Sequence, residues 1–305
     1  MSLPSIHDWN ALDAGARASL LQRPRPQENR ERAGRVAEII ATVRAGGDAA
    51  LLDYARQLDG VSLETLEVPA AARSRALGEL PADLTAALRD ATARIESFHA
   101  AGRPADYATE TAPGVACRAL HRPIRRVGLY VPAGTAPLPS TVLMLAIPAR
   151  LAGCTEIVVC SPPGADGECN PAVLAAAQMS GVHRVFRAGG AQAVAAMAFG
   201  TATVPRCDKI FGPGNAWVTA AKQQISTDPD GAAIDMPAGP SELMVIADSS
   251  CEPAWVASDL LSQAEHGPDS QVLLIALDEA VAMSVRAEVE TQLAKLPRRD
   301  TAAQA

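Results

Sequence analysis

Two side chains late in the chain have types and a spacing that suit metal coordination. Gln263 and His266 lie three residues apart in the stretch DLLSQAEHGPDSQ, residues 259–271. If one helix continues through both, they project from the same face of its last turn, an amide oxygen beside an imidazole nitrogen. A histidine in a last turn is also typical of a cap, because it can bond the terminal carbonyl groups. The spacing alone leaves ligation and capping both open.

The residues around this pair predict a helix with signals at both ends. Ser249 and Glu252 have the spacing of a capping box, and Pro253 suits a first helical turn. Gly267 and Pro268 are expected to end the helix.

Short apolar strands alternate with helical stretches from residue 127 onward, and most strands are followed by Gly or Pro. This alternation is typical of βαβ units on a parallel sheet. The expected strands are 127–131, 156–160, 184–187, 209–211, 243–247 and 272–277. The expected helices are 141–151, 171–179, 191–199, 216–225 and 279–293, and another helical pattern begins at residue 300.

The first third of the chain is expected to be mainly helical, with helices at 9–21, 28–46, 48–58 and 81–99. The fold class is therefore α/β: two Rossmann-like parallel-sheet domains, incomplete, with a helical N-terminal segment. We expect a helical arm over 1–25. A first, discontinuous α/β domain is expected to combine 26–126 with 237–305 and to be incomplete at its C-terminal side. A second α/β domain, associated with NAD below, is expected over 127–236.

Four turns combine glycine with a side chain that can form hydrogen bonds: YVPAG (130–134), GGAQ (189–192), GPGN (212–215) and PAGPS (237–241). In open α/β sheets ligands bind outside the carboxyl ends of the strands, and glycine lets them approach the backbone. GGAQ and GPGN each open a helix, whose free N–H groups favour an anion such as a pyrophosphate. The fingerprint G-x-G-x-x-G is absent, and glycine pairs are common in plain turns. These turns are compatible with nucleotide binding and equally with a purely structural role of their glycines.

Composition excludes several classes of protein. The 305 residues carry a net charge of −7 without a long run of Lys and Arg, which argues against nucleic acid as a partner. Six cysteines show neither zinc spacing nor the density of a disulfide scaffold, so a reducing compartment is expected. No apolar run approaches the ~20 residues that span a bilayer, and no signal peptide opens the chain. We expect a cytoplasmic protein with no membrane partner.

Five segments, in this order, resemble the histidinol dehydrogenase family: VGLYVPAG, FRAGGAQAVAAMAFGT, DKIFGPGN, AAIDMPAGPSE and DLLSQAEHGPDSQV. The early stretch VRAGGDAALLDYARQLDG is similar as well, and the likeness covers nearly the whole chain. The resemblance implies a zinc-dependent cytosolic homodimer that oxidises L-histidinol to L-histidine through L-histidinaldehyde, in two successive hydride transfers to NAD.

The same resemblance implies roles for particular residues. It implies zinc ligands at Gln263 and His266, substrate-binding residues at Ser241, Gln263 and His266, and NAD-binding residues at Tyr130, Gln192 and Asn215. In that family zinc chiefly holds the imidazole and amino groups of the substrate, so it acts mainly as a template.

The chain also departs from the family pattern. The family continues past the position of residue 305 with a Pro-Glu-His segment that supplies the general acid/base pair and with the remaining Asp and His zinc ligands. His7, His99, His121 and His183 match none of these positions. We therefore expect no catalytic residue within this chain, and no activity from residues 1–305 alone. The alternatives are a non-catalytic nucleotide-binding fragment of the same fold and a dehydrogenase for another small amino or acidic alcohol.

Overall fold

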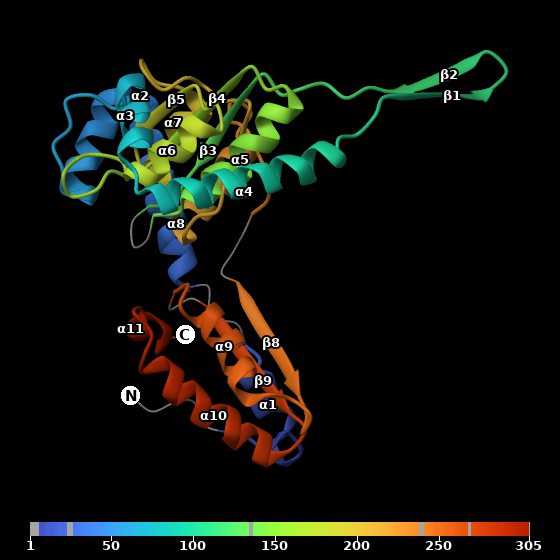
Figure 1. Ribbon diagram of the computed structural model, residues 1–305. Coiled ribbons are helices and arrows are strands. Elements are labelled where there is room, and N and C mark those ends of the chain that lie inside the picture. The colour runs from blue at the N-terminus through green and yellow to red at the C-terminus, as the bar shows by residue number, and fades with distance from the viewer. Residues whose placement is uncertain (1–5, 23–26, 134–136, 238–240, 268–269, 305) are drawn as a thin grey trace. The chain divides into compact units, whose positions relative to one another are not determined.

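Figure 1 shows the computed structural model, which describes residues 6–22, 27–133, 137–237, 241–267 and 270–304. The chain forms two compact units, one comprising Met1–Arg30 with Gly239–Ala305 and the other Glu31–Ala238. Parts of the motifs YVPAG, PAGPS and HGPDS, including Gly134 and Pro268, lie outside the described residues.

The larger unit is built around a five-stranded parallel sheet in the order β5-β4-β3-β6-β7. Its strands are β3 (Arg126–Tyr130), β4 (Glu156–Ser161), β5 (Arg184–Arg187), β6 (Lys209–Phe211) and β7 (Ala233–Ile234). From β3 the chain moves outward through β4 to β5, then returns to add β6 and β7 on the other side of β3. The strand order therefore reverses between β3 and β6, which is the topological switch point of the sheet.

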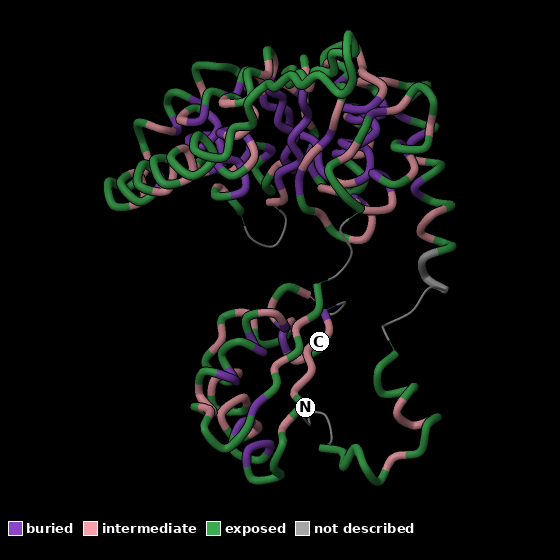
Figure 2. The backbone as a smooth tube through the Cα atoms, turned by 90° about the vertical axis from the view of Figure 1, so that its right-hand side faces the viewer, coloured by how far each residue is buried: buried purple, intermediate pink, exposed green. Residues whose placement is uncertain are grey.

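A helix follows each of the first four strands of this sheet: α5 (Pro139–Ala152), α6 (Pro171–Met179), α7 (Gly190–Phe199) and α8 (Ala216–Thr227). Two apolar clusters fill the space between helices and strands. One contains side chains of α5 and α6, and the other contains side chains of α7 and α8. Figure 2 shows the resulting band of buried residues through the middle of this unit. The expected elements of 127–236 are confirmed to within two residues at each end.

Helices from the N-terminal third also pack in these clusters. They are α2 (Gln27–Tyr54), α3 (Ala70–Glu79) and α4 (Ala82–Ala101). Val36 and Val43 of α2 belong to the α7 and α8 cluster, and Leu88 of α4 belongs to the other. This grouping differs from the expected domains, which joined 26–126 to 237–305. An amphipathic stripe shows that a helix buries one face but not which sheet it covers.

The expected helices 28–46 and 48–58 correspond to two helical segments within α2, which meet at a kink where we placed their boundary. Gly47 has φ 52° and ψ −131°, which is outside the helical region, and the chain continues into a π-helical turn, η2 (Ala55–Asp59). Helix α3 and the antiparallel hairpin of β1 (Tyr107–Ala112) and β2 (Val115–Ala119) were not expected. Figure 1 shows this hairpin projecting from the rest of its unit.

The smaller unit contains a two-stranded parallel sheet, β8 (Glu242–Ala247) and β9 (Gln271–Ala276). Its helices are α1 (Ala14–Leu20), α9 (Pro253–Ala264), α10 (Glu279–Leu293) and α11 (Arg299–Ala302), and a 3-10 turn, η1 (Trp9–Ala11), precedes α1. The expected helix 9–21 is therefore interrupted, because the carboxylate of Asp13 accepts a hydrogen bond from the N–H of Ala16 and starts a new helix. With parallel sheets and helices in both units, the expected α/β fold class is confirmed.

Candidate cofactor and metal sites

The three side chains expected to bind NAD lie at the carboxyl edge of the five-stranded sheet. Tyr130 ends β3, Gln192 lies in the first turn of α7 after β5, and Asn215 precedes α8 after β6. A hydrogen bond from the Gly190 N–H to the Tyr130 hydroxyl, 3.1 Å long, joins the first two turns. The structure therefore gathers these residues at the edge where such sheets bind ligands, with Tyr130 and Asn215 flanking the switch point.

Tyr130 presents a neutral hydroxyl at this edge. The side chain is buried, and burial raises the pKa of the phenol while the hydrogen bond from Gly190 acts in the opposite direction. Because the oxygen accepts from Gly190, the hydroxyl proton can be donated to another acceptor.

Gln192 lies folded over the glycine that precedes it by two positions. Only 4% of the residue is exposed. A Cβ atom on Gly190 would stand 2.6 Å from the Oε1 atom of Gln192, and Gly190 has a φ of 61°. The positive φ favours glycine at 190, and a Cβ there would also displace the Gln192 amide.

Asn215 is the N-cap of α8. Its Oδ1 atom accepts hydrogen bonds from the N–H groups of Trp217, at 3.1 Å, and Val218, at 3.2 Å. The amide oxygen is therefore committed to capping, and the NH₂ group is the part that could donate to a ligand. A Cβ atom on Gly214 would lie 2.3 Å from the Cγ1 atom of Val218. Glycine is therefore needed at 214 for lack of space and not because of a positive φ.

A cavity of about 420 Å³ opens beside these turns, where the chain leaves β4. Its lining includes Ala133, Pro162, Asp166 and Asn170, and Asn170 caps the first turn of α6. The volume suits part of a small-molecule ligand. None of Tyr130, Gln192 and Asn215 is among the described residues that line it.

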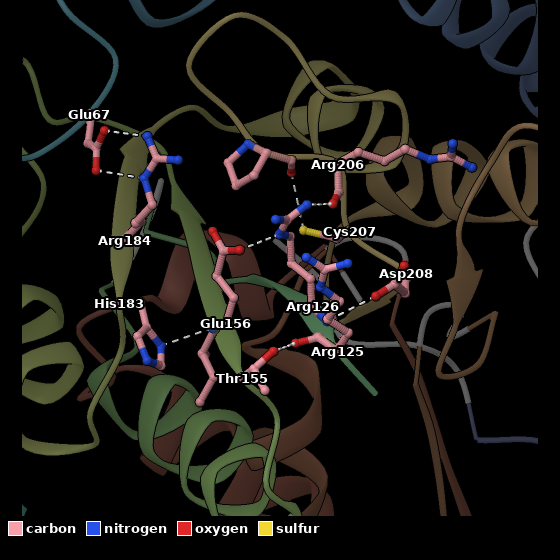
Figure 3. Close-up of polar contacts among 12 residues, drawn as sticks. Glu67, Arg125, Arg126, Thr155, Glu156, His183, Arg184, Arg206, Cys207 and Asp208 are labelled. Carbon is pink, nitrogen blue, oxygen red and sulfur yellow. Dashed lines mark hydrogen bonds and ion pairs between the residues drawn. The ribbon is translucent and has the colours of Figure 1, made fainter. Parts of the chain in front are cut away.

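The opposite, amino edge of the sheet carries the ion pairs drawn in Figure 3. Arg184 donates to both carboxylate oxygens of Glu67, at 2.9 and 2.6 Å, and this bonding lowers the pKa of Glu67. Arg126 pairs with Glu156 at the starts of β3 and β4. His183 accepts a hydrogen bond from the Ile157 N–H through Nδ1. These contacts tie strand starts together, and the contact of His183 is a structural one.

In the smaller unit, Gln263 and His266 do not have the geometry that was predicted from the sequence. Helix α9 ends at Ala264, with Glu265 as its C-cap, so Gln263 lies in the last turn whereas exposed His266 lies beyond the helix. The prediction that both project from one helical turn is wrong. The His266 N–H donates to the Gln263 carbonyl at 3.2 Å, so the backbone of this residue, and not its ring, bonds the helix end.

The start of α9 also differs from the prediction. Pro253 is the first helical residue, as expected, but the N-cap is Glu252 and its side chain makes no capping bond. The capping box of Ser249 with Glu252 is therefore absent. Instead, the carboxylate of Asp248 accepts hydrogen bonds from the backbone and hydroxyl of Ser250. The local side-chain bonding therefore begins one residue earlier than predicted and involves different donors.

Gln263 is oriented by two partners. Its Nε2 atom donates to the Ser241 carbonyl and to the Ser270 hydroxyl, each at 3.3 Å. With the NH₂ group so occupied, the Oε1 atom is the group left for a ligand. Ser241 and Gln263 are thus brought together as expected, whereas buried Ser270 was missed, although it lies in the same polar stretch.

The donor chemistry of Gln263 and His266 suits a metal ion only in part. Amide oxygen and imidazole nitrogen are both possible ligands, but a zinc site normally has at least three protein ligands. Among the described residues, no group of three or more His, Cys, Asp or Glu side chains could hold a metal ion.

Comparisons with known proteins identify the family. The profile described as Histidinol dehydrogenase matches residues 22–305. The chain is 57% identical over 300 residues to the histidinol dehydrogenase of Xanthomonas axonopodis pv. citri (strain 306), covering 98% of this chain and 69% of that protein. It is 52% identical over 305 residues to that of Escherichia coli O157:H7, again spanning 69% of the relative. The chain belongs to the histidinol dehydrogenase family.

A solved structure supports the same assignment. The crystal structure of histidinol dehydrogenase from Elizabethkingia anophelis is similar with a TM-score of 0.86 and 44% identity, over 96% of this chain and 67% of that one. As a histidinol dehydrogenase, the protein is an oxidoreductase of histidine biosynthesis. No described helix is both long and apolar enough to cross a membrane.

Two further residues at the carboxyl edge of this histidinol dehydrogenase were not anticipated from the sequence. Lys222 of α8 is 2% exposed and contacts the carboxylate of Asp235, which follows β7. Both bond the backbone of Gly212 in the GPGN turn. A lysine and an aspartate 13 residues apart carry no motif, because their contact depends on the packing of α8 against the sheet.

Proposed function

We propose that the protein oxidises L-histidinol to L-histidine through L-histidinaldehyde, in two successive hydride transfers to NAD, with zinc as a second cofactor. The observation that carries the proposal is the 57% identity to a histidinol dehydrogenase over 98% of the chain. NAD, when bound, supplies the hydride acceptor. The chain's own part is to bind and orient the cofactor and the substrate.

Tyr130, Gln192 and Asn215 are the proposed NAD-binding residues. Support comes from their place at the carboxyl edge and from the switch point between β3 and β6. The hydroxyl of Tyr130 and the NH₂ group of Asn215 are hydrogen-bond donors. The amino end of α7 adds backbone N–H groups that favour the negative charge of a pyrophosphate, whereas in α8 the N–H groups of Trp217 and Val218 are already capped by Asn215.

Ser241, Gln263 and His266 are the proposed substrate-binding residues, and Gln263 and His266 the proposed zinc ligands. The bonds that orient the Gln263 amide support this assignment, because they leave its oxygen for the ion. Zinc needs further ligands besides these two. When bound, it would hold a chelating substrate more than activate water. No described residue is assigned as the catalytic base.

The protein is further proposed to work as a homodimer in the cytoplasm. All six cysteines are free thiols, which suits a reducing compartment. Burial raises the pKa of Cys169 and of Cys207 to about 12, so these two stay protonated and unreactive.

The test is NADH formation with L-histidinol, measured beside another small amino alcohol and a small acidic alcohol. The proposal predicts turnover with histidinol and little with the others. Preference for another alcohol would favour the related dehydrogenase, and NAD binding without any turnover would favour the non-catalytic nucleotide-binding protein. Running the assay on the protein as encoded by its gene and on residues 1–305 alone also tests the expected inactivity of the latter.

A further inference from the structure

The GPGN turn is held from two sides by an ion pair whose lysine is buried and whose aspartate is partly exposed. The Lys222 ammonium donates to the Gly212 carbonyl at 2.9 Å and contacts the carboxylate of Asp235. The other carboxylate oxygen of Asp235 accepts the Gly212 N–H at 3.0 Å. Asp235 also accepts the N–H of Met236 at 2.7 Å. One lysine and one aspartate therefore bind both peptide groups of a single glycine.

Gly212 has a conformation that needs such support. Its φ is 126°, and a Cβ there would lie 2.2 Å from the carbonyl oxygen of Tyr130. The residue is buried just after the end of β6, so its N–H and carbonyl both require partners. Lys222 and Asp235 supply them.

Bonding the two peptide groups of Gly212 stabilises the fold, but that requirement alone does not call for charged side chains. Removing two charges from water is costly, and a buried ion pair is often no more stabilising than apolar side chains of similar volume. Lys222 is 3% exposed at its side chain and Asp235 26%, so the lysine is the more fully desolvated partner. Apolar side chains could not bond the two peptide groups of Gly212. Lys222 and Asp235 do bond them and so fix their orientation.

The orientation of the Gly212 peptide groups determines where the proposed NAD-binding residues lie. Gly212 contacts the backbone of Tyr130 on one side and is followed, three positions later, by Asn215 on the other. We propose that Lys222 and Asp235 are positioning residues, which fix the Gly212–Asn215 turn so that Tyr130 and Asn215 are presented to the cofactor together. This inference rests on the proposed NAD site. Without the pair, the turn would have to be ordered on binding, which weakens affinity.

The test uses a double substitution that leaves no unpaired charge, Lys222→Met with Asp235→Asn. The asparagine keeps an acceptor for the Gly212 N–H, while the Gly212 carbonyl loses its donor. A matched control, Arg184→Met with Glu67→Gln, removes an ion pair at the amino edge of the same sheet. NAD affinity is measured by calorimetry and folding by circular dichroism and thermal melting.

The expected result is a loss of NAD affinity of roughly tenfold in the Lys222/Asp235 variant, the size of one hydrogen bond, and no change in the control. If the double variant does not fold, Lys222→Met alone is measured, because part-exposed Asp235 remains hydrated there. Affinity within about twofold of the unchanged protein in a folded variant would overturn the positioning role. If the unchanged protein fails to bind NAD, the proposed NAD site itself is overturned, and this inference with it.

Discussion

At the scale of single residues, Asn215 has two roles that substitution can separate. Its amide oxygen caps α8, and its NH₂ group is proposed to contact NAD. Asn215→Ser keeps a capping oxygen and should leave stability nearly unchanged, whereas Asn215→Ala should lose ~1 kcal/mol. Both should weaken NAD binding roughly tenfold. Thermal melting and NAD titration of the two variants check this, and full NAD affinity in Asn215→Ser would remove Asn215 from the site.

Asp235 should make stability depend on pH in acid. Burial would raise its pKa, but hydrogen bonds from Lys222, Gly212 and Met236 outweigh burial and lower it. A carboxylate with a lowered pKa stabilises the folded state above the ordinary Asp pKa of ~3.9, and this contribution is lost as the pH falls through the folded value. Denaturant unfolding at about pH 6 and about pH 3 should therefore show a smaller acid loss in Lys222→Met with Asp235→Asn than in the unchanged protein. Equal losses would contradict the assignment.

Substitution of His266 tests whether its ring binds a metal ion or has only a structural role. The ring is exposed and lies outside α9, so His266→Asn should change unfolding free energy by no more than ~0.5 kcal/mol. If the ring binds zinc, metal content should fall steeply while NAD affinity is retained, since the proposed NAD-binding residues belong to the other compact unit. Metal analysis and NAD titration measure both. Normal zinc content with normal turnover would exclude this residue from the metal site.

Some residues of the candidate sites could be predicted from the sequence, and others could not. Gly-containing turns at strand ends located Tyr130, Gln192 and Asn215 at one edge, because strand direction fixes which ends meet. The same turns did not show that Asn215 caps a helix. Lys222 and Ser270 were missed, because each meets its partner through packing of separate elements.

At the scale of secondary structure, helix α2 offers a matched pair of glycines. Gly47 has a φ of 52° at the kink, whereas a Cβ atom added to Gly34 of the same helix would meet nothing within 4 Å. Gly47→Ala should cost about 1–3 kcal/mol through backbone strain. Gly34→Ala should stabilise by up to ~1 kcal/mol through helix propensity. Denaturant unfolding of both variants measures these changes. Similar changes in unfolding free energy for the two variants would contradict the kink at Gly47.

Elements with strong local end signals were predicted best. The bounds of α6 and α10 agree with those expected, and in each a side chain caps the first turn, Asn170 and Asp278 respectively. The end of α9 was misplaced because Gly267 suggested a later stop than the chain makes. Hairpin β1–β2 was missed because its strands are exposed and lack apolar alternation.

At the scale of the whole molecule, the α/β class followed from the alternation of strands and helices, but the grouping of elements did not. Helices α2, α3 and α4 belong with the five-stranded sheet because their apolar faces complete its two clusters. Amphipathic periodicity carries no information about the partner surface.

This histidinol dehydrogenase is proposed to carry one alcohol through two oxidations by NAD. The most direct measurement is the ratio of NADH formed to L-histidine formed, determined on the protein as encoded by its gene with limiting L-histidinol and zinc present. The proposed chemistry predicts two NADH for each histidine, with no aldehyde released. One NADH per histidinol with accumulation of the aldehyde, or histidine formation without NADH, would contradict it.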